Sequence, residues 1–434
     1  MNAYLGIDLG STTTKAVILD DEGEVLGRGI TNSRSNYSVA ARIAGTEATI
    51  DARFALLGRE LGALDQTGLP AAFRLEQYLT QLRLLGEIVE EEAQKGRSAA
   101  YGRPLLDRLT EILAAMEGAE QARFIRREEA GSHFFRDRAA ADFSKFAEER
   151  GDRRGVTFEA MLAVFDRAIL RVENADVDVS FEGNILRAVE RIGGGDVRES
   201  VQRVRDMPLV MGASVGTGYG RARLPFPREQ IRSEILCHGL GAHAMFPETR
   251  TVLDIGGQDT KAIQVDGAGI VTSFQMNDRC AAGCGRYLGY IADEMNLGLH
   301  ELGPLADQSK RPTRVNSTCT VFAGAELRDR LGMGEKREDI LAGLHRAIML
   351  RAMSLLARSG GVNDEFTFTG GVARNSAAVH ALMGLVEENY GQRVLNISPN
   401  SIYTGALGAA MFAQRSAETL HPIPAPAPEA EATA

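Results

Sequence analysis

Several features that mark specialised protein classes are scarce in this sequence. Four cysteines among 434 residues are too few for a disulfide scaffold. No sustained basic segment occurs and the formal net charge is −9, which argues against a dedicated nucleic-acid binder. No apolar run approaches about eighteen residues, and the first residues lack the basic and apolar segments of a signal peptide. We therefore expect a cytoplasmic protein that binds neither membrane nor nucleic acid.

The rest of the composition is that of a globular enzyme. Hydrophobic residues make up 44% and charged residues 25%, and the length allows two or three domains of about 150 residues. In a cytosolic chain, Cys237, Cys280, Cys284 and Cys319 are better candidates for metal or redox roles than for disulfides. The plain alternative is that most of them are small buried hydrophobes.

A hairpin pattern occurs twice in the chain. Residues 3–30 read as three short antiparallel strands, and the pattern returns at residues 251–274. At a constant offset of 246 residues the two hairpins share identical residues, among them Asp8 with Asp254 and Lys15 with Lys261. This repeat predicts two homologous lobes that open with the same hairpin.

Between the two hairpins the sequence has helical periodicity and many charges. It predicts a helical insertion in the first lobe, whose charged face is either a solvated surface or a docking face for a partner. The expected division is a first lobe over 1–50 and 205–250 with the helix 404–415 packed back onto it, an insertion over 51–204, a second lobe over 251–403, and a disordered Pro/Ala/Glu tail over 416–434.

The two hairpin turns are candidate phosphate-binding loops. Their exposed backbone amides can form an anion nest if the lobes face each other. The turns comprise Gly10, Ser11, Thr12 and Thr13 in one lobe and Gly256, Gly257, Gln258 and Asp259 in the other. Asp8 and Asp254 end the preceding strands and suit a Mg²⁺ ion held through water. Lys15 and Lys261 either balance phosphate charge or are exposed, and Gln258 is a candidate for orienting an attacking water.

A third glycine turn follows a later strand. Gly370 and Gly371 end that strand, a helix is expected from Ala373, and Asn375 completes a candidate nucleoside site. The three turns together resemble the phosphate-1, phosphate-2 and adenosine motifs of the superfamily of sugar kinases, heat-shock chaperones and actin. The resemblance implies an α/β fold with two ribonuclease-H-like lobes and ATP between them.

Two cysteines lie where helices are expected to begin. Cys280 and Cys319 each precede a helical pattern, and a helix N-terminus favours thiolate. Two thiolates cannot complete a [4Fe–4S] cluster, so the economical arrangement is a subunit interface to which each chain contributes two. Cys284 is expected one helical turn further on and packed, while Cys237 beside His238 and His243 fits no common zinc spacing.

The cysteine segments narrow the resemblance. NDRCAAGCGRYL and NSTCTVFAGAEL resemble the cluster-binding segments of 2-hydroxyacyl-CoA dehydratase activators and of benzoyl-CoA reductase ATPase subunits. This resemblance implies Cys280 and Cys319 as [4Fe–4S] ligands. The long segment after the first hairpin looks most like the larger ATPase subunit of class I benzoyl-CoA reductase, whereas the homodimeric activators are compact.

The resemblance implies an ATP-driven oxidoreductase component of anaerobic aromatic degradation. Its implied partners are a smaller ATPase subunit that supplies two more cysteines, two catalytic subunits that bind the acyl-CoA, and reduced ferredoxin as donor. The alternatives are a homodimeric dehydratase activator, a small-molecule kinase, and a nucleotide-controlled assembly protein. In the last two, Cys280 and Cys319 would be packing residues.

Overall fold

The computed structural model describes residues 1–33, 36–62, 64–128, 134–150, 155–175, 177–278, 284–315 and 320–417. The chain forms two compact units, of which unit 1 comprises Met1–Gly45 with Leu209–Ala434, and unit 2 comprises Thr46–Pro208. The division falls inside helix α1 (Tyr37–Leu61). The predicted insertion, 51–204, lies within the bounds of unit 2, and the tail predicted from residue 416 lies outside the described residues from 418 onward.

Unit 1 contains two sheets. The first has the strand order β3-β2-β1-β4 and the second the order β7-β6-β5-β8-β9. The strands of the first sheet are β1 (Asn2–Leu9), β2 (Thr13–Leu19), β3 (Val25–Asn32) and β4 (Val210–Thr217). Those of the second sheet are β5 (Thr251–Ile255), β6 (Thr260–Val265), β7 (Val271–Asn277), β8 (Glu365–Thr369) and β9 (Val394–Asn396).

The hairpin repeat extends to strand register. Asp8 lies opposite Lys15, and Asp254 opposite Lys261, with each hairpin carrying a bulge at the same place, between Ile18 and Leu19 and between Gln264 and Val265. Each first strand also pairs in parallel with a strand from much later in the sequence, β4 in one lobe and β8 in the other. The duplicated sequence therefore folds into duplicated topology.

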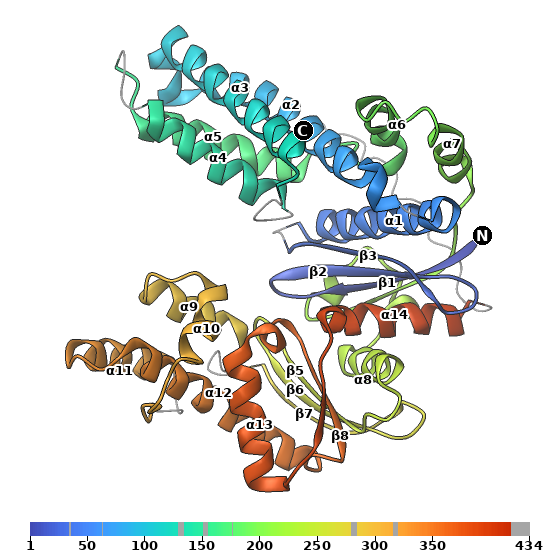
Figure 1. Cartoon of the computed structure of the whole chain (residues 1–434), viewed down its shortest axis with the longest axis vertical. Helices are drawn as coiled ribbons and strands as arrows, with labels where there is room; N and C mark the ends of the chain where they lie inside the picture. Colours follow the sequence, from blue (N-terminus) through green and yellow to red (C-terminus); the bar gives the residue numbers. More distant parts are fainter. Residues whose placement is uncertain are drawn as a thin grey trace. The chain divides into compact units, whose positions relative to one another are not determined.

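Two helices, α8 (Glu234–Met245) and α14 (Thr404–Arg415), lie between the two sheets of unit 1, with α14 against the first sheet and α8 against the second (Figure 1). Their backbones approach closely because glycine faces backbone at the crossing. A Cβ built on Gly408 would lie 1.9 Å from the carbonyl oxygen of Cys237, and one on Gly241 would lie 2.0 Å from that of Thr404. Small residues thus permit this contact.

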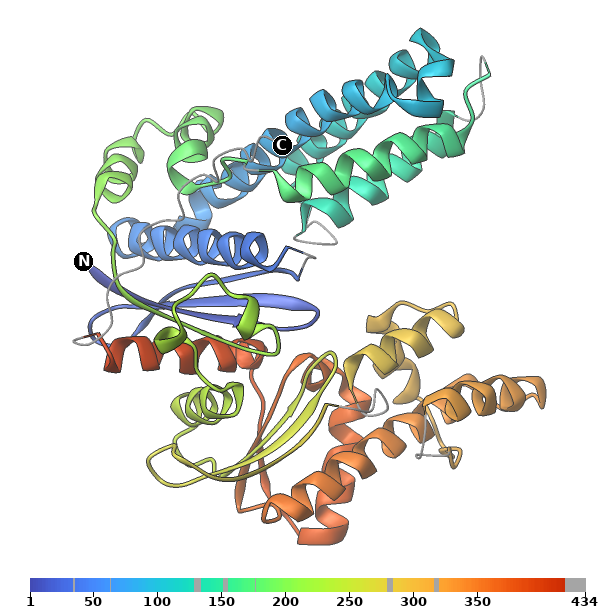
Figure 2. The ribbon, with the colours of Figure 1, turned by 180° about the vertical axis from the view of Figure 1, so that it is seen from behind.

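Apart from the first residues of α1, the remaining α-helices of unit 1 belong to the second lobe (Figure 2). They are α9 (Gly285–Glu294), α10 (Leu302–Ala306), α11 (Thr320–Gly332), α12 (Arg337–Ser359) and α13 (Ser376–Tyr390). Among the described ranges, α12 is the one helix long and apolar enough to span a bilayer, but two-thirds of its most apolar stretch is buried. It packs against β6, β7 and α13, as expected of a core helix.

Unit 2 is helical. Besides the larger part of α1, its α-helices are α2 (Leu69–Ala93), α3 (Arg103–Arg126), α4 (Phe135–Arg150), α5 (Phe158–Asn174), α6 (Phe181–Arg191) and α7 (Arg198–Asp206). Helices α2, α3, α4 and α5 pack around one apolar core. Several carboxylates buried between helices are paired with arginines of a neighbouring helix, namely Glu76, Glu92, Glu120, Asp142 and Glu173. Such pairs specify how the helices align, because a carboxylate buried without its partner is costly.

Candidate nucleotide site

The two predicted phosphate turns touch each other. One follows β1 and the other follows β5, so both lie at the same ends of equivalent strands. A Cβ built on Gly257 would lie 2.3 Å from Oγ1 of Thr12 and 3.3 Å from Oγ of Ser11. The structure therefore brings together two groups of predicted residues that are 246 positions apart in the sequence.

Ser33 braces the first turn. Its hydroxyl donates to the carbonyl oxygen of Gly10 at 2.6 Å, and its backbone N–H donates to that of Thr12 at 2.8 Å. Within the described part of the chain, the N–H groups of Ser11 and Thr12 donate no hydrogen bond. The turn thus engages its carbonyl oxygens and leaves these amides for an anion.

The N-terminus of α9 braces the second turn in the same manner. The N–H groups of Gly285 and Arg286 donate to the carbonyl oxygens of Gly256 and Gly257, each at 2.8 Å. Across the described residues, the N–H groups of Gly257 and Gln258 have no acceptor, and the Gln258 side chain makes no hydrogen bond. The two turns offer unpaired amides where they meet, which suits a polyphosphate.

Asp8 and Asp254 are buried on either side of one imidazole. Nε2 of His238, on α8, lies 3.9 Å from Oδ2 of Asp8, and its Nδ1 lies 3.6 Å from Oδ1 of Asp254. Although burial alone would raise it, His238 and Lys261 hold the pKa of Asp254 below its ordinary value. The second-lobe group is therefore a carboxylate.

Asp8 and Asp254 have the donor chemistry for a hydrated magnesium ion. No cluster of three or more His, Cys, Asp or Glu side chains placed to hold a metal occurs among the residues the structure describes. Magnesium usually keeps several waters and needs only one or two carboxylates beside the phosphates. Asp8 and Asp254 supply that hard oxygen chemistry, with Asp8 accepting no hydrogen bond from any described residue.

The third glycine turn lies against the second lobe's phosphate strand. Gly370 has φ 84°, and a Cβ there would lie 2.2 Å from the carbonyl oxygen of Ile255, whereas Gly371 faces open space. The helix predicted from Ala373 begins instead at Ser376. The prediction was wrong because Asn375 caps the helix, with Oδ1 accepting from the N–H of Ala378 at 3.0 Å.

Cys280 and Cys319, the predicted cluster ligands, lie outside the described residues. Cys284 is buried, but it is the N-cap of α9 and does not lie one helical turn inside, because the helix begins only at Gly285. Cys237 is fully buried between α8, α14 and the first sheet, and burial raises the pKa of its thiol to about 12. This thiol is therefore protonated and unreactive at neutral pH and serves to pack the core.

Sequence reasoning missed several residues that complete this site. Thr369 donates to Oδ1 of Asp254 at 2.8 Å, and Thr404 lies 3.3 Å from Nδ1 of His238. Glu234 was also missed. The sequence contains a signal that could have identified Thr369: like Thr217 in the first lobe, it ends a parallel strand and is followed by glycine. His238 stood out only as a weak zinc candidate.

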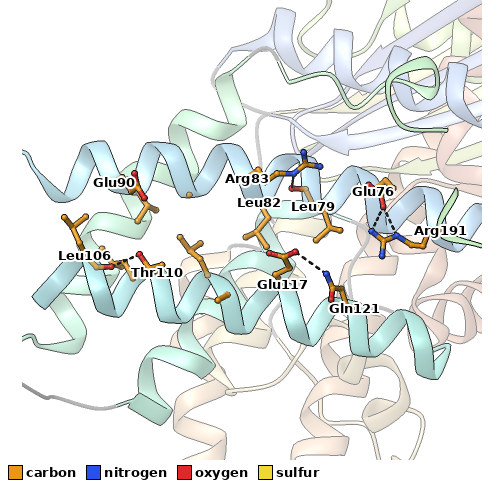
Figure 3. A pocket seen from close by; sticks show the side chains of 15 residues that line it. Glu76, Leu79, Leu82, Arg83, Glu90, Leu106, Thr110, Glu117, Gln121 and Arg191 are labelled. Atoms are coloured by element: carbon orange, nitrogen blue, oxygen red, sulfur yellow. Dashed lines mark hydrogen bonds and ion pairs between the residues drawn. The ribbon is translucent and has the colours of Figure 1, made fainter. Parts of the chain in front are cut away.

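A separate pocket of about 490 Å³ lies within unit 2, between α2 and α3 (Figure 3). Its lining combines apolar side chains, among them Leu79, Leu82 and Leu106, with the polar or charged side chains of Arg83, Glu90, Glu117 and Gln121. Gly86 leaves room there, since a Cβ on it would first meet Leu113 at 3.8 Å. No residue of the predicted nucleotide site lines this pocket.

Sequence comparisons agree on one family. The profile described as "BadF/BadG/BcrA/BcrD ATPase family" matches residues 5–413. The (R)-2-hydroxyglutaryl-CoA dehydratase activating ATPase of Acidaminococcus fermentans is 42% identical over 207 residues, 48% of this chain and 77% of that protein. The 2-hydroxyisocaproyl-CoA dehydratase activator of Clostridioides difficile is 40% identical over 229 residues, 52% of this chain and 80% of that protein. A benzoyl-CoA reductase subunit of Thauera aromatica is 33% identical over 175 residues, 40% of this chain and 62% of that protein.

Solved structures agree on the fold. The Acidaminococcus fermentans (R)-2-hydroxyglutaryl-CoA dehydratase component A has a TM-score of 0.52 and 24% identity, covering 96% of this chain and 100% of that one. The Clostridium difficile 2-hydroxyisocaproyl-CoA dehydratase activator with bound ADPNP has a TM-score of 0.50 and 23% identity, covering 96% of each chain. The predicted α/β fold with two equivalent hairpin-bearing sheets is confirmed, and this chain shares it with these two proteins.

Proposed function

Because the chain belongs to the BadF/BadG/BcrA/BcrD ATPase family, we propose that it hydrolyses ATP to drive low-potential electrons into a partner that acts on an acyl-CoA. The main support for the proposed ATP site is the contact between the two phosphate turns, at Gly257 and Thr12. In this proposal the free amides of both turns bind the phosphates and Gln258 orients the attacking water. Mg²⁺, held through water by Asp8 and Asp254, would neutralise charge on the phosphates.

The second turn offers a mechanical link to the cysteine segments. Its carbonyl oxygens at Gly256 and Gly257 bind the first amides of α9, and the residues before α9 include Cys280. A change of this turn on nucleotide binding or hydrolysis would move the start of α9 by the same contacts. We propose that this transmits the nucleotide state to a [4Fe–4S] cluster, held by Cys280 and Cys319 and shared with a second ATPase chain. When bound, such a cluster supplies one-electron transfer.

A 2-hydroxyacyl-CoA dehydratase is the partner that we propose. Two activators of such enzymes share 40% and 42% identity with this chain, against 33% for the benzoyl-CoA reductase subunit of Thauera aromatica. The dehydratase reading predicts a homodimer of this chain. Reduced ferredoxin remains the proposed donor and the cytoplasm the proposed location.

Benzoyl-CoA reductase is the second candidate. It is favoured by unit 2, because the long segment after the first hairpin resembles that of the larger ATPase subunit. This reading predicts a pair with a smaller homologous ATPase and two catalytic subunits that reduce the aromatic ring. Anaerobic purification from the natural source with a tag on this chain separates the candidates by the subunits recovered.

Iron content tests the electron-transfer proposal. We expect about four irons for each pair of ATPase chains. Cys280→Ala and Cys319→Ala should each lose this iron, whereas Cys237→Ala, the matched control, should keep it. ATP-dependent reduction of a low-potential acceptor should disappear with the iron. If both variants folded and kept all their iron, the cluster proposal would be wrong, and assays for a small-molecule kinase would follow.

A further inference from the structure

Lys15 and Lys261 occupy the same position in the hairpin repeat but have different surroundings. Each lies opposite the lobe's aspartate, Lys15 beside Asp8 and Lys261 beside Asp254. Lys15 is half-buried, whereas the side chain of Lys261 is only 3% exposed. Equal sequence positions therefore do not imply equal roles.

Three carboxylates enclose the Lys261 ammonium. Nζ donates to Oδ2 of Asp254 at 3.1 Å and to Oδ1 of Asp259 at 2.8 Å, and it lies 4.0 Å from Oε2 of Glu234. Although burial alone would lower it, these carboxylates raise the pKa of Lys261 above its ordinary value. A cation so neutralised has little attraction left for a phosphate.

Glu234 extends this cluster from the second lobe to the end of the first sheet. Its Oε1 lies 3.6 Å from a guanidinium nitrogen of Arg221, which follows β4, while its Oε2 faces Lys261. Glu234 itself begins α8. The charges thus run from the segment after β4, through α8, to the second phosphate turn at Asp259.

The first lobe lacks such a cluster among the residues described. Lys15 forms no ion pair there, and its Nζ lies 3.4 Å from a Cβ built on Gly10, at the turn itself. In the second lobe, both oxygens of Asp254 are engaged, one by Lys261 and the other by Thr369. The lysine and aspartate of the second lobe are therefore bonded to each other and to their neighbours, whereas those of the first lobe make no such bonds among the described residues.

We propose that the duplicated lysines have divided their roles: Lys15 binds the nucleotide phosphates, and Lys261 is a positioning residue that fixes Asp254 and Asp259 and ties the second turn to α8 through Glu234. This inference rests on the proposed nucleotide site. It assigns a function to the cluster of Arg221, Glu234 and Lys261, none of which touches the nucleotide in this account.

The roles separate in a comparison of binding with turnover. ADP binding is measured by calorimetry in EDTA. We expect Lys15→Met to weaken it by at least about tenfold, the effect of losing a charge-assisted hydrogen bond. The affinity for adenosine, which has no phosphate, should stay unchanged. Lys261→Met should keep ADP affinity in EDTA within about threefold, yet lower kcat for ATP hydrolysis by about tenfold or more, because misplaced carboxylates impair chemistry more than binding.

Removal of a buried lysine alone can prevent folding. The double variant Glu234→Gln/Lys261→Met, which removes one carboxylate together with the cation, is therefore measured beside Lys261→Met. Thermal unfolding shows whether each variant is folded. Equal loss of ADP affinity in Lys15→Met and in either Lys261 variant would overturn the division of roles. Unchanged kcat in folded Lys261 variants would overturn the positioning role. If wild type bound no ADP at all, the proposed nucleotide site itself would fail, an outcome distinct from both.

Discussion

At the scale of single residues, Asp254 depends on partners from three separate parts of the chain. Thr369 of β8 bonds one of its oxygens, Lys261 of β6 bonds the other, and His238 of α8 lies 3.6 Å away. A buried carboxylate is tolerated only when such groups compensate for the lost water. The cost of removing one of them should therefore be measurable.

Thr369→Val tests this dependence. The change keeps the side-chain shape but removes a hydrogen bond to a buried charge, so we expect a loss of about 1.5–3 kcal/mol in the free energy of unfolding. Urea unfolding measures it. Thr272→Val, at an exposed position in strand β7, is the matched control and should change stability little. A loss in Thr369→Val no larger than in the control would contradict the role given to this hydroxyl.

The sequence predicted the residues near the hairpin turns and missed those that reach them from elsewhere. Asp8 and Asp254 were identifiable because a repeat at constant offset marks them. His238 and Glu234 were not, because they lie on a helix whose own sequence does not reveal what it faces. Tertiary structure alone brings α8 to the carboxylates.

At the scale of helices and strands, paired charges join the helices of unit 2. Glu92 of α2 is bound by Lys95 at 3.1 Å, and by Arg167 and Arg171 of α5 at 3.1 and 2.9 Å. The hydrogen bonds from Lys95, and then those from the arginines, outweigh burial and hold the pKa of Glu92 below its ordinary value. This linkage stabilises unit 2 above the unfolded pKa and is lost as pH falls through the folded one.

Acid should therefore loosen the contact of α2 with α5. We expect amide hydrogen exchange in these helices to accelerate as the pH is lowered from about 5 towards 3, after correction for the intrinsic rate. Glu92→Gln should already exchange faster at pH 7 and respond less to acid. Glu111→Gln, which removes an exposed pair with Arg108, is the control. The same acid response in Glu92→Gln and wild type would exclude this carboxylate as its source.

Gly86 leaves a site for stabilisation in α2. Glycine inside a helix costs roughly 0.5–1 kcal/mol relative to alanine, and a Cβ at Gly86 would meet only Leu113, at an ordinary contact distance of 3.8 Å. We expect Gly86→Ala to stabilise unit 2 by about that amount, as slower exchange of α2 amides. Faster exchange would mean that the pocket needs this glycine.

Element boundaries were less predictable than element identity. The hairpins followed from alternation and turn residues, whereas the start of α13 depended on the cap that Asn375 forms with Ala378. The start of α9 likewise coincides with its contacts to the second phosphate turn, through Gly285 and Arg286. Both contacts join segments in ways that helical periodicity does not encode.

At the scale of the whole of unit 1, the crossing of α8 and α14 joins elements of both lobes. Gly408→Ala should test it, because the added methyl would lie 1.9 Å from the carbonyl oxygen of Cys237. Alanine favours helix by about 1 kcal/mol, but the clash should outweigh this and destabilise by roughly 1–3 kcal/mol. Thermal unfolding measures the net effect. A stability equal to or above that of wild type would show that the helices separate without cost.

The central claim is that the two phosphate turns meet to form one nucleotide site. Gly257→Ala tests it most directly, because its methyl would lie 2.3 Å from Oγ1 of Thr12 and force the turns apart, whereas Gly384→Ala adds the same methyl to α13 in open space. By calorimetry of Mg·ADP binding, we predict that Gly257→Ala loses at least about tenfold in affinity, ~1.4 kcal/mol, while Gly384→Ala binds as wild type does. Wild-type affinity in a folded Gly257→Ala would contradict the claim.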